Sequence, residues 1–381
     1  MKKILFGITS LTLGGAERVL VDLANALCDQ YDITIFTIYA KGEFEKQLSK
    51  KIKVKSLYNM QYNELTNRKK KLVPLKILLY KKSIYKKYIC NNYDVEIAFL
   101  EGPITRLFSI KNENTKKIAW IHNDITKVFG NGLKSKLKKM LDKKIYSKYD
   151  TLVFVSKDNL KKFNEEYKDI GNESLKPIKK EVIYNYIDKE NIIKKAEEKT
   201  NIVFNKDKIN FITVARLVEQ KGIDRLIEIH SKLIENGLKH NFYIIGDGPE
   251  KEKLEILIKK YKVEKTFKLL GKKENPYPYI KNADYFCLLS RFEGYGMVLE
   301  EAKIMDKPII ITNTAAREAV NSYPKAIVLE NSKQGIYEGL KKIVMDRNIN
   351  FNLNRNKTEK YDNSKLLKRV IKLIENQGET L

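Results

Sequence analysis

The side chains best suited to chemistry lie at two places where a predicted strand is followed by a predicted helix. Arg216 and Lys221 follow one apolar strand, and Glu293 and Glu301 follow a later one. A guanidinium and an ammonium at the end of a parallel strand can hold a diphosphate. Carboxylates are poor phosphate ligands but good acceptors for sugar hydroxyls. From their positions alone, either pair is equally compatible with ordinary solvated surface charges.

Glycines mark the same kind of junction. Gly294 and Gly296 precede a helix predicted to begin near Gly296, and its first turn has free N–H groups and the positive end of the dipole. Gly246 and Gly248 lie in another strand-to-helix turn, where Pro249 is predicted to start the helix. The third glycine of a dinucleotide fingerprint is missing, so this turn indicates a close approach of backbone to a nucleotide rather than NAD binding.

The elements that must position these residues alternate along the whole chain, in two series. Continuous apolar strands that alternate with helices predict parallel sheets covered on both faces. The predicted strands span 3–8, 32–40, 94–100, 117–123, 151–156, 209–215, 241–247, 267–271, 284–290, 307–313 and 326–330. A polar, lysine-rich stretch around 188–207 separates the two series.

The length of 381 residues exceeds what one hydrophobic core usually organises. We therefore predict an α/β protein of two doubly wound, Rossmann-like domains, over 1–186 and 187–360. A closing helix over 361–381 is expected to pack back on the first domain. Ligands are expected at the carboxyl ends of the strands, in a cleft between the domains.

The charge of the chain is strongly unbalanced, with 74 Lys and Arg against 48 Asp and Glu, a formal net charge of +26. Such a surplus predicts attraction to polyanions: nucleic acid, an anionic membrane or phosphorylated small molecules. The three cysteines, Cys28, Cys90 and Cys287, lie in apolar contexts and predict reduced core thiols in a cytosolic protein. Neither a signal peptide nor a membrane-spanning helix is predicted.

On these residues the sequence resembles the retaining glycosyltransferases of family 4, of the bacterial surface-polysaccharide type, which have the GT-B fold. The resemblance extends over nearly the whole chain and is strongest over 209–320. There the segments VARLVEQKGIDRLI, IIGDGPEKEKLE and SRFEGYGMVLEEA follow one another in the family's order and spacing.

The resemblance implies a hexosyltransferase-type enzyme that moves a sugar from a nucleotide-diphosphate donor, with a UDP-sugar as the family-level expectation. Arg216 and Lys221 match the residues that bind the donor diphosphate. Glu301 matches the acid that bonds the ribose hydroxyls, and Glu293 the acid that reaches the donor sugar. The other donor-binding positions that the resemblance implies are Gly14, Gly15, Gly246, Gly294, Tyr295, Gly296, Met297 and Val298.

His122 follows a strand of the first domain. A lone histidine is more often structural than catalytic, but the resemblance places His122 where the family keeps an active-site histidine near the donor sugar. The catalytic set expected is thus His122, Glu293, Arg216 and Lys221. No two aspartates are separated by a single residue, so the D-x-D motif of metal-dependent transferases is absent. Because the cations can stabilise the departing diphosphate, neither a metal ion nor a cofactor is expected.

The sequence departs from the family pattern after the strand at 307–313. The glycines common in the following loop are missing around Ala315 and Glu318. How this loop meets the donor, and which sugar the donor carries, is therefore not read from the sequence.

Two lysine-rich segments, 67–88 and 133–148, belong to the first domain. The former holds Arg68 and eight lysines without an acid, with apolar residues interleaved. Such a helix can lie on anionic lipid, and it can equally be a covering helix whose apolar residues face the sheet. We expect peripheral attachment to the inner face of the cell membrane and a lipid-linked glycan or polysaccharide acceptor.

Three other classes of protein remain as alternatives. A basic nucleic-acid-binding protein would fit the charge, but no nucleic-acid-binding motif occurs. An NAD-dependent oxidoreductase is disfavoured by the missing glycine. Another GT-B enzyme, such as a nucleotide-sugar epimerase or a phosphorylase, shares the architecture and the cationic residues.

Overall fold

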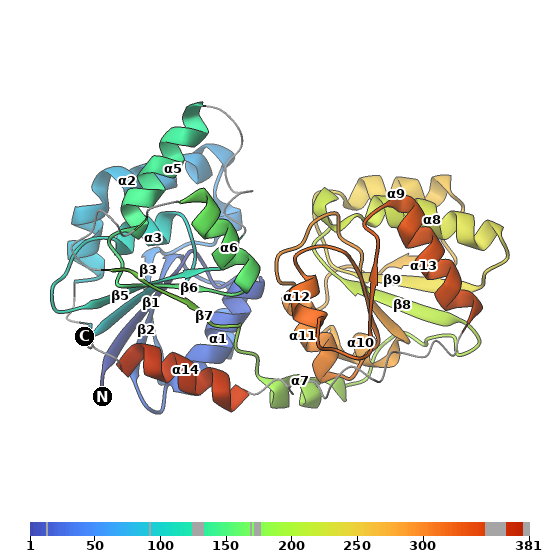
Figure 1. Cartoon of the computed structure of the whole chain (residues 1–381). Helices are drawn as coiled ribbons and strands as arrows, with labels where there is room; N and C mark the ends of the chain where they lie inside the picture. The colour runs from blue at the N-terminus through green and yellow to red at the C-terminus, as the bar shows by residue number, and fades with distance from the viewer. Residues whose placement is uncertain are drawn as a thin grey trace. The chain divides into compact units, whose positions relative to one another are not determined.

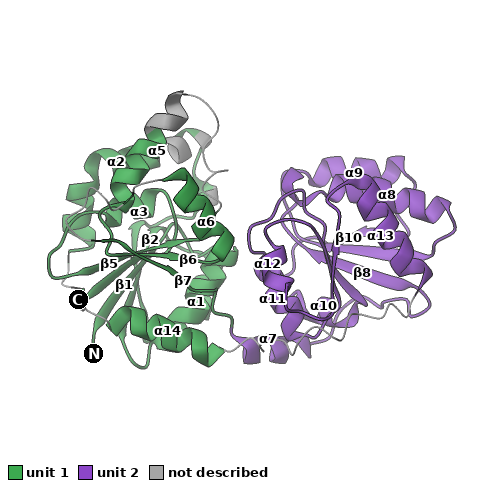
Figure 2. Ribbon diagram, viewed as in Figure 1, with its two compact units in different colours: residues 1–187, 363–381 green, residues 188–362 purple. Residues whose placement is uncertain are grey.

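The computed structural model describes residues 1–12, 14–90, 93–123, 133–167, 170, 177–346 and 363–375. The chain forms two compact units. Unit 1 comprises Met1–Ile187 and Asn363–Leu381, and unit 2 comprises Asp188–Asp362 (Figure 2). Each unit is a parallel sheet with helices on both faces, which is the predicted fold class.

Unit 1 is built on a seven-stranded sheet in the order β3-β2-β1-β4-β5-β6-β7. All six neighbouring pairs are parallel. The strands are β1 Lys3–Ile8, β2 Asp32–Tyr39, β3 Lys53–Tyr58, β4 Val95–Ala98, β5 Lys116–Ile121, β6 Thr151–Phe154 and β7 Lys179–Val182. The order reverses between β1 and β4, and the carboxyl edge at such a reversal is where open α/β sheets generally bind ligands.

Helices cover both faces of this sheet (Figure 1). One apolar core contains residues of α2, α3, α5 and α6, and α1 and α14 lie on the opposite face. The helices are α1 Gly15–Leu27, α2 Asn67–Tyr88, α3 Pro103–Phe108, α5 Leu133–Tyr146, α6 Lys157–Glu166 and α14 Asn363–Glu375. Helix α14 is tied to the sheet through Glu375, which accepts hydrogen bonds from Lys2 at 2.6 Å and Tyr31 at 2.8 Å.

Unit 2 is built on a six-stranded parallel sheet in the order β10-β9-β8-β11-β12-β13. Its order reverses between β8 and β11, which are hydrogen-bonded neighbours. The strands are β8 Ile209–Val214, β9 His240–Ile245, β10 Phe267–Leu269, β11 Tyr285–Leu288, β12 Ile309–Thr312 and β13 Ala326–Leu329. The β-branched and aromatic residues of these strands form the centre of the unit's core.

The helices of unit 2 again lie in two layers (Figure 1). The core cluster of the unit includes residues of α8, α9 and α13, whereas α10, α11 and α12 lie on the other face. Their bounds are α7 Lys189–Ala196, α8 Ile223–Glu235, α9 Lys251–Lys260, α10 Tyr277–Asn282, α11 Met297–Ile304, α12 Arg317–Val320 and α13 Lys333–Met345. Within the described residues, no helix is long and apolar enough to cross a membrane.

The structure differs from the sequence-based prediction at several places. Strand β3 was not predicted, because it is an edge strand whose lysines interrupt the apolar run. The expectation that all three cysteines are core thiols is wrong for Cys90, which is exposed at the end of α2, whereas Cys28 and Cys287 are buried. Helix α9 begins at Lys251, so Pro249 belongs to the turn before it.

Candidate functional site

The sequence-predicted cations and acids of unit 2 follow its two central strands. Arg216 and Lys221 lie beyond β8, and Glu293 and Glu301 lie beyond β11. Because β8 and β11 pair in parallel, their carboxyl ends open at the same edge of the sheet. The strand order reverses between them, and such a switch point is where open α/β sheets bind ligands.

Arg216 is exposed, and its guanidinium makes no ion pair or hydrogen bond within the described part of the chain. Its backbone is held from both sides, since the Ala215 N–H donates to Ile245 and the Leu217 N–H donates to Asp247. A rigid loop thus presents a guanidinium whose donors are available to a ligand.

Gly246 and Gly248 allow this close packing of loops. A Cβ on Gly246, which has a φ of +148°, would lie 1.8 Å from the carbonyl oxygen of Ala215, and one on Gly248 would lie 2.4 Å from that of Leu217. The two glycines are therefore required by the protein's own backbone, a physical reason for the G-x-G pattern that needs no nucleotide.

Lys221 and Glu293 form an ion pair between Nζ and Oε2. Their side chains are only 17% and 12% exposed. Glu293 Oε2 also accepts from the Ser290 hydroxyl at 3.4 Å. The sequence placed both residues at one edge of the sheet, but it did not predict that they pair with each other.

The loops that carry this pair are fastened together by Arg291. Its guanidinium donates to both carboxylate oxygens of Asp224 at 2.7 Å, and its Nη1 also donates to the Glu219 carbonyl at 2.8 Å. Burial acts to raise the pKa of Asp224, but the hydrogen bonds and charge of Arg291 outweigh it and hold that pKa below its usual range. Between the same loops the Arg291 N–H donates to the Gln220 carbonyl at 2.8 Å.

Glu301 lies on α11, and the helix begins after Gly296, as predicted. Gly296 has a φ of +72°, a conformation that favours glycine, and it leads directly into Met297 and Val298. The Tyr277 hydroxyl of α10 donates to Glu301 Oε1 at 3.1 Å. This contact limits the rotamers of the carboxylate that the sequence predicted to bind a ribose.

The neighbouring acid, Glu300, has a structural role that the sequence did not indicate. It is 2% exposed, it accepts from the Tyr295 hydroxyl at 2.7 Å, and it pairs with Lys303 at 2.7 Å. This hydrogen bond attaches Tyr295 to α11 and so fixes the segment from Gly294 to Gly296 against the helix. Lys303 also donates to the carbonyl of Ala319 in α12, which ties α12 to α11.

Gly14 and Gly15 lie in unit 1, at the start of α1 and just beyond β1. Gly14 is the N-cap with extended backbone, and an added Cβ would lie 2.2 Å from Glu17 Oε2. Burial raises the pKa of Glu17. The glycine at position 14 thus leaves room for this carboxyl group beside the first turn of the helix.

His122 lies at the carboxyl end of β5 in unit 1. Its backbone N–H donates to Glu101 Oε1 at 2.6 Å, and its carbonyl accepts from Asn159 at 3.2 Å. Its Nε2 atom and the Oδ1 atom of Asn159 are buried without a hydrogen-bond partner within the described residues. Burial lowers the pKa of His122 to about 3, so the imidazole is neutral at physiological pH.

The positions that sequence reasoning missed are mainly supporting residues. Glu101 accepts from the backbone of His122 and Asn123, whereas Tyr277 holds Glu301. Glu101 and Tyr277 belong to segments distant in the sequence from the residues that they contact. The position of Glu101 just after strand β4 was the one sequence feature that could have indicated such a role. The Arg291–Asp224 pair had no such signal.

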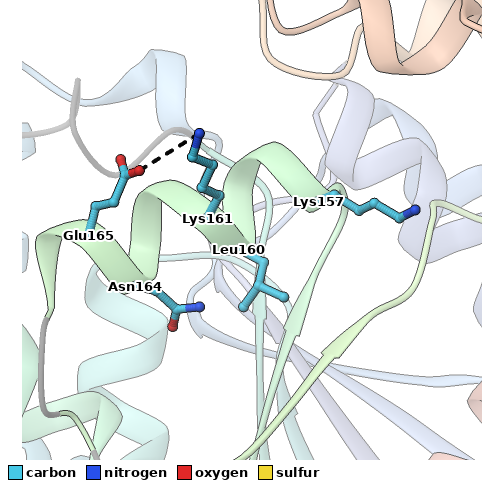
Figure 3. Close-up of a pocket in the computed structure, with 5 residues that line it drawn as sticks. All are labelled: Lys157, Leu160, Lys161, Asn164 and Glu165. Carbon is cyan, nitrogen blue, oxygen red and sulfur yellow. Dashed lines mark ion pairs between the residues drawn. The ribbon is translucent and has the colours of Figure 1, made fainter.

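A surface pocket lies on unit 1 (Figure 3). Its lining residues, Lys157, Leu160, Lys161, Asn164 and Glu165, all belong to α6. None of the sequence-predicted site residues is among them. Lys161 and Glu165, one turn apart on α6, form an ion pair at 4.0 Å, and both are exposed. The side chains that line this hollow therefore amount to ordinary surface charges.

Among the described residues, no three or more His, Cys, Asp or Glu side chains lie together in a way that could hold a metal ion.

Comparison with known proteins assigns the chain to a family. Residues 194–377 match the profile of "Glycosyl transferases group 1". The chain is 28% identical over 98% of its length to a Campylobacter jejuni protein, N-acetylgalactosamine-N,N'-diacetylbacillosaminyl-diphospho-undecaprenol 4-alpha-N-acetylgalactosaminyltransferase, all of which is covered. A second C. jejuni protein, GalNAc-alpha-(1->4)-GalNAc-alpha-(1->3)-diNAcBac-PP-undecaprenol alpha-1,4-N-acetyl-D-galactosaminyltransferase, is 28% identical over 79% of this chain and 77% of its own.

Among solved structures, Anabaena Alr3699/HepE in complex with UDP and glucose superposes with a TM-score of 0.72 at 16% identity, over 98% of this chain and 99% of that one. That likeness supports the GT-B fold recognised from the sequence. With its two parallel α/β units and its matched C-terminal region, the chain belongs to the group 1 glycosyltransferases, family 4, and has the GT-B fold.

Proposed function

We propose that this glycosyltransferase moves a sugar from a UDP-sugar, with retention of configuration, onto a lipid-linked or polysaccharide acceptor in surface-glycan synthesis. The observation that carries the proposal is the convergence of Arg216, Lys221, Glu293 and Glu301 at the switch point of unit 2. Cations and acids at one sheet edge match a ligand that has a diphosphate between two groups rich in hydroxyls.

The diphosphate would bind to the cations. Arg216 is exposed and free of partners within the described residues, so its guanidinium can bind two phosphate oxygens at once. Lys221 adds a second positive charge on the same loop. The start of α11, at Met297 and Val298, would turn the positive end of the helix dipole toward the diphosphate.

The hydroxyl groups would bind to the acids. Glu301, held by Tyr277, would accept from the ribose, and Glu293 would accept from the donor sugar. The ion pair between Arg291 and Asp224 holds the two loops together, so Glu293 would need little reorganisation to bind the donor.

His122 would contact the donor sugar from unit 1. Its neutral imidazole suits a hydrogen bond to a hydroxyl, because a buried positive charge there would be costly. The buried Nε2 of His122 and Oδ1 of Asn159 are a potential pair of polar atoms for such a ligand. Closure of a cleft between the two domains stays a prediction.

In the proposed reaction the sugar–phosphate bond breaks and the electron pair leaves with the diphosphate. Arg216, Lys221 and the first turn of α11 stabilise the charge that develops. The acceptor hydroxyl forms the new glycosidic bond on the same face and passes its proton to the departing phosphate. This electrostatic set makes a divalent metal unnecessary in the proposal.

The nature of the acceptor is supported by the names of the two Campylobacter relatives, which specify undecaprenol-linked diphospho-glycans. Helix α2 has a surface suited to such a lipid-embedded substrate. Leu72, Leu75 and Leu79 are 51%, 51% and 68% exposed, whereas Val73 and Ile77 are buried in the core. Some apolar residues of this helix are thus buried in the core, whereas others are exposed to solvent, and packing against the sheet explains only the buried ones.

The same helix also carries exposed lysines. Lys76, Lys82, Lys86 and Lys87 of α2 are exposed. The pKa of Lys81 is lowered by burial and by the nearby charges of Lys148 and Lys82, so the basic segments at 67–88 and 133–148 are neighbours in space. Exposed leucines and exposed lysines on one helix fit an anionic bilayer, and we propose that α2 binds one.

The transferase proposal is tested by incubating the protein with a panel of UDP- and GDP-sugars and a synthetic undecaprenyl-diphosphate-linked acceptor. Product mass and the anomeric configuration by NMR give the result. Arg216→Ala should lower kcat/KM by about 10- to 100-fold, since a charge-assisted hydrogen bond contributes about 1.5–3 kcal/mol. Inversion of configuration, or the absence of any transfer across the panel, would refute it.

The membrane proposal is tested by sedimentation with vesicles of phosphatidylglycerol and phosphatidylcholine. The triple variant of Leu72, Leu75 and Leu79 to Ser should lose binding at physiological salt. The control is Ile256→Ser on α9, which is 65% exposed but lies in unit 2. Equal binding of both variants would exclude α2 as the docking surface.

A further inference from the structure

Lys221 and Glu293 form an ion pair with each other. In the function proposed above, the ligand's diphosphate needs Lys221 and its sugar needs Glu293. Both side chains are largely removed from water, and Lys221 donates to no other side chain within the described residues. By contrast, the guanidinium of Arg216 is exposed and free there. Of the two cations at this edge of the sheet, one is therefore neutralised by the protein itself.

The pair can open only by rotation of its side chains. The loops on either side are joined by the Arg291–Asp224 bridge and by the hydrogen bond from Gln220 Nε2 to the Phe292 carbonyl at 3.0 Å. Because these contacts hold the backbones together, Lys221 and Glu293 remain within reach of each other whether or not a ligand is present.

This proximity has opposite consequences for two ligands. A bare nucleoside diphosphate must compete with Glu293 for the ammonium of Lys221, and the carboxylate left beside it repels the phosphate oxygens. A nucleotide sugar brings hydroxyl groups as well. These donate to the Glu293 carboxylate and offset the loss of Lys221, so the opened pair is satisfied on both sides.

Resting on the function proposed above, we propose that Glu293 determines specificity for the sugar-bearing nucleotide over the free nucleoside diphosphate. It holds Lys221 until sugar hydroxyls replace that contact. After transfer, the sugar is gone, and Glu293 again competes for Lys221 and favours release of the diphosphate. The residue thus acts on the affinity for product as well as for donor.

The test measures binding of UDP and of UDP-sugars by calorimetry, with GDP in parallel. Glu293→Gln should bind UDP on the order of tenfold more tightly than the wild type, because Lys221 is released from an ionic partner. Its affinity for the preferred UDP-sugar should stay the same or fall. The control is Glu219→Gln, which removes an exposed acid of the same loop and should change both affinities less than twofold.

A double variant, Lys221→Met with Glu293→Gln, separates this effect from altered folding. If the gain comes mainly from the freed ammonium, the Glu293→Gln substitution should bring a clearly smaller gain in UDP affinity when Lys221 is Met, because only the repulsion between the carboxylate and the phosphate is then relieved. If Glu293→Gln binds UDP no more tightly than a wild type that does bind it, the inference is overturned and the transferase proposal stands. If the wild type binds no nucleotide or nucleotide sugar, the transferase proposal itself fails.

Discussion

Acidification should destabilise unit 2 through a buried histidine pair. His230 Nδ1 lies 2.8 Å from His240 Nε2, His230 Nε2 lies 2.8 Å from the Thr266 hydroxyl, and His240 Nδ1 lies 2.9 Å from the Leu238 carbonyl. Because a carbonyl only accepts, His240 donates from Nδ1 and accepts at Nε2. His230 then donates from Nδ1, and both imidazoles are satisfied while neutral.

Burial lowers the pKa of His230 to about 2 and that of His240 to about 4. In the unfolded chain both pKa values return to about 6.5, so the unfolded state binds more protons below that pH. The stabilisation is present above pH 6.5 and is lost as the pH falls. From pH 7.5 to pH 5.5, each histidine should lower the free energy of unfolding by about 1.4 kcal/mol, or by about 3 kcal/mol for the pair.

The assay is hydrogen exchange of the β9 amides as a function of pH, corrected for the intrinsic exchange rate. Trp120, the single tryptophan of the sequence, lies in unit 1 and reports that unit separately by its fluorescence. In unit 1, burial raises the pKa of Glu96 and Glu101, so these two groups stabilise the folded unit as the pH falls. His122, whose pKa is lowered by burial, has the opposite effect on the stability of the same unit. Unit 2 should therefore be the more acid-sensitive unit.

A variant without the pair, His230→Gln with His240→Asn, provides the control. It should be less stable at pH 7.5 but should lose most of the pH dependence of β9 protection over this range. An unchanged slope in the variant, or a slope in the wild type below about one third of the expected value, would refute the assignment of acid sensitivity to these histidines.

Three further outcomes are expected. Gly246→Ala should destabilise unit 2 by at least about 3 kcal/mol in denaturant unfolding, because its Cβ meets the Ala215 carbonyl, whereas Gly237→Ala, with open space around it, should cost about 1 kcal/mol; similar costs would contradict the packing argument. Tyr277→Phe should raise the donor KM about threefold to tenfold with kcat nearly unchanged, and Tyr279→Phe on the same helix should not, so an equal effect would remove Tyr277 as a positioning residue. Turnover should survive EDTA, and loss of activity that magnesium restores would contradict the metal-independent reaction.

The sequence alone was enough to predict the fold and the family. Apolar strands that alternate with helices leave few architectures other than doubly wound α/β units, because a parallel sheet must be covered on both faces. The order of the segments around Arg216, Gly246 and Glu293 then identified the glycosyltransferase family. The edge strand β3 escaped prediction because exposed lysines disrupt its apolar pattern.

Only the tertiary structure decided which partners these residues have. It paired Lys221 with Glu293, left Arg216 free among the described residues, and backed Glu301 with Tyr277 from another helix. These contacts join segments far apart in the chain, and their existence depends on the register of β8 against β11. A sequence pattern reports which element carries a side chain, whereas packing between elements sets which partner that side chain meets.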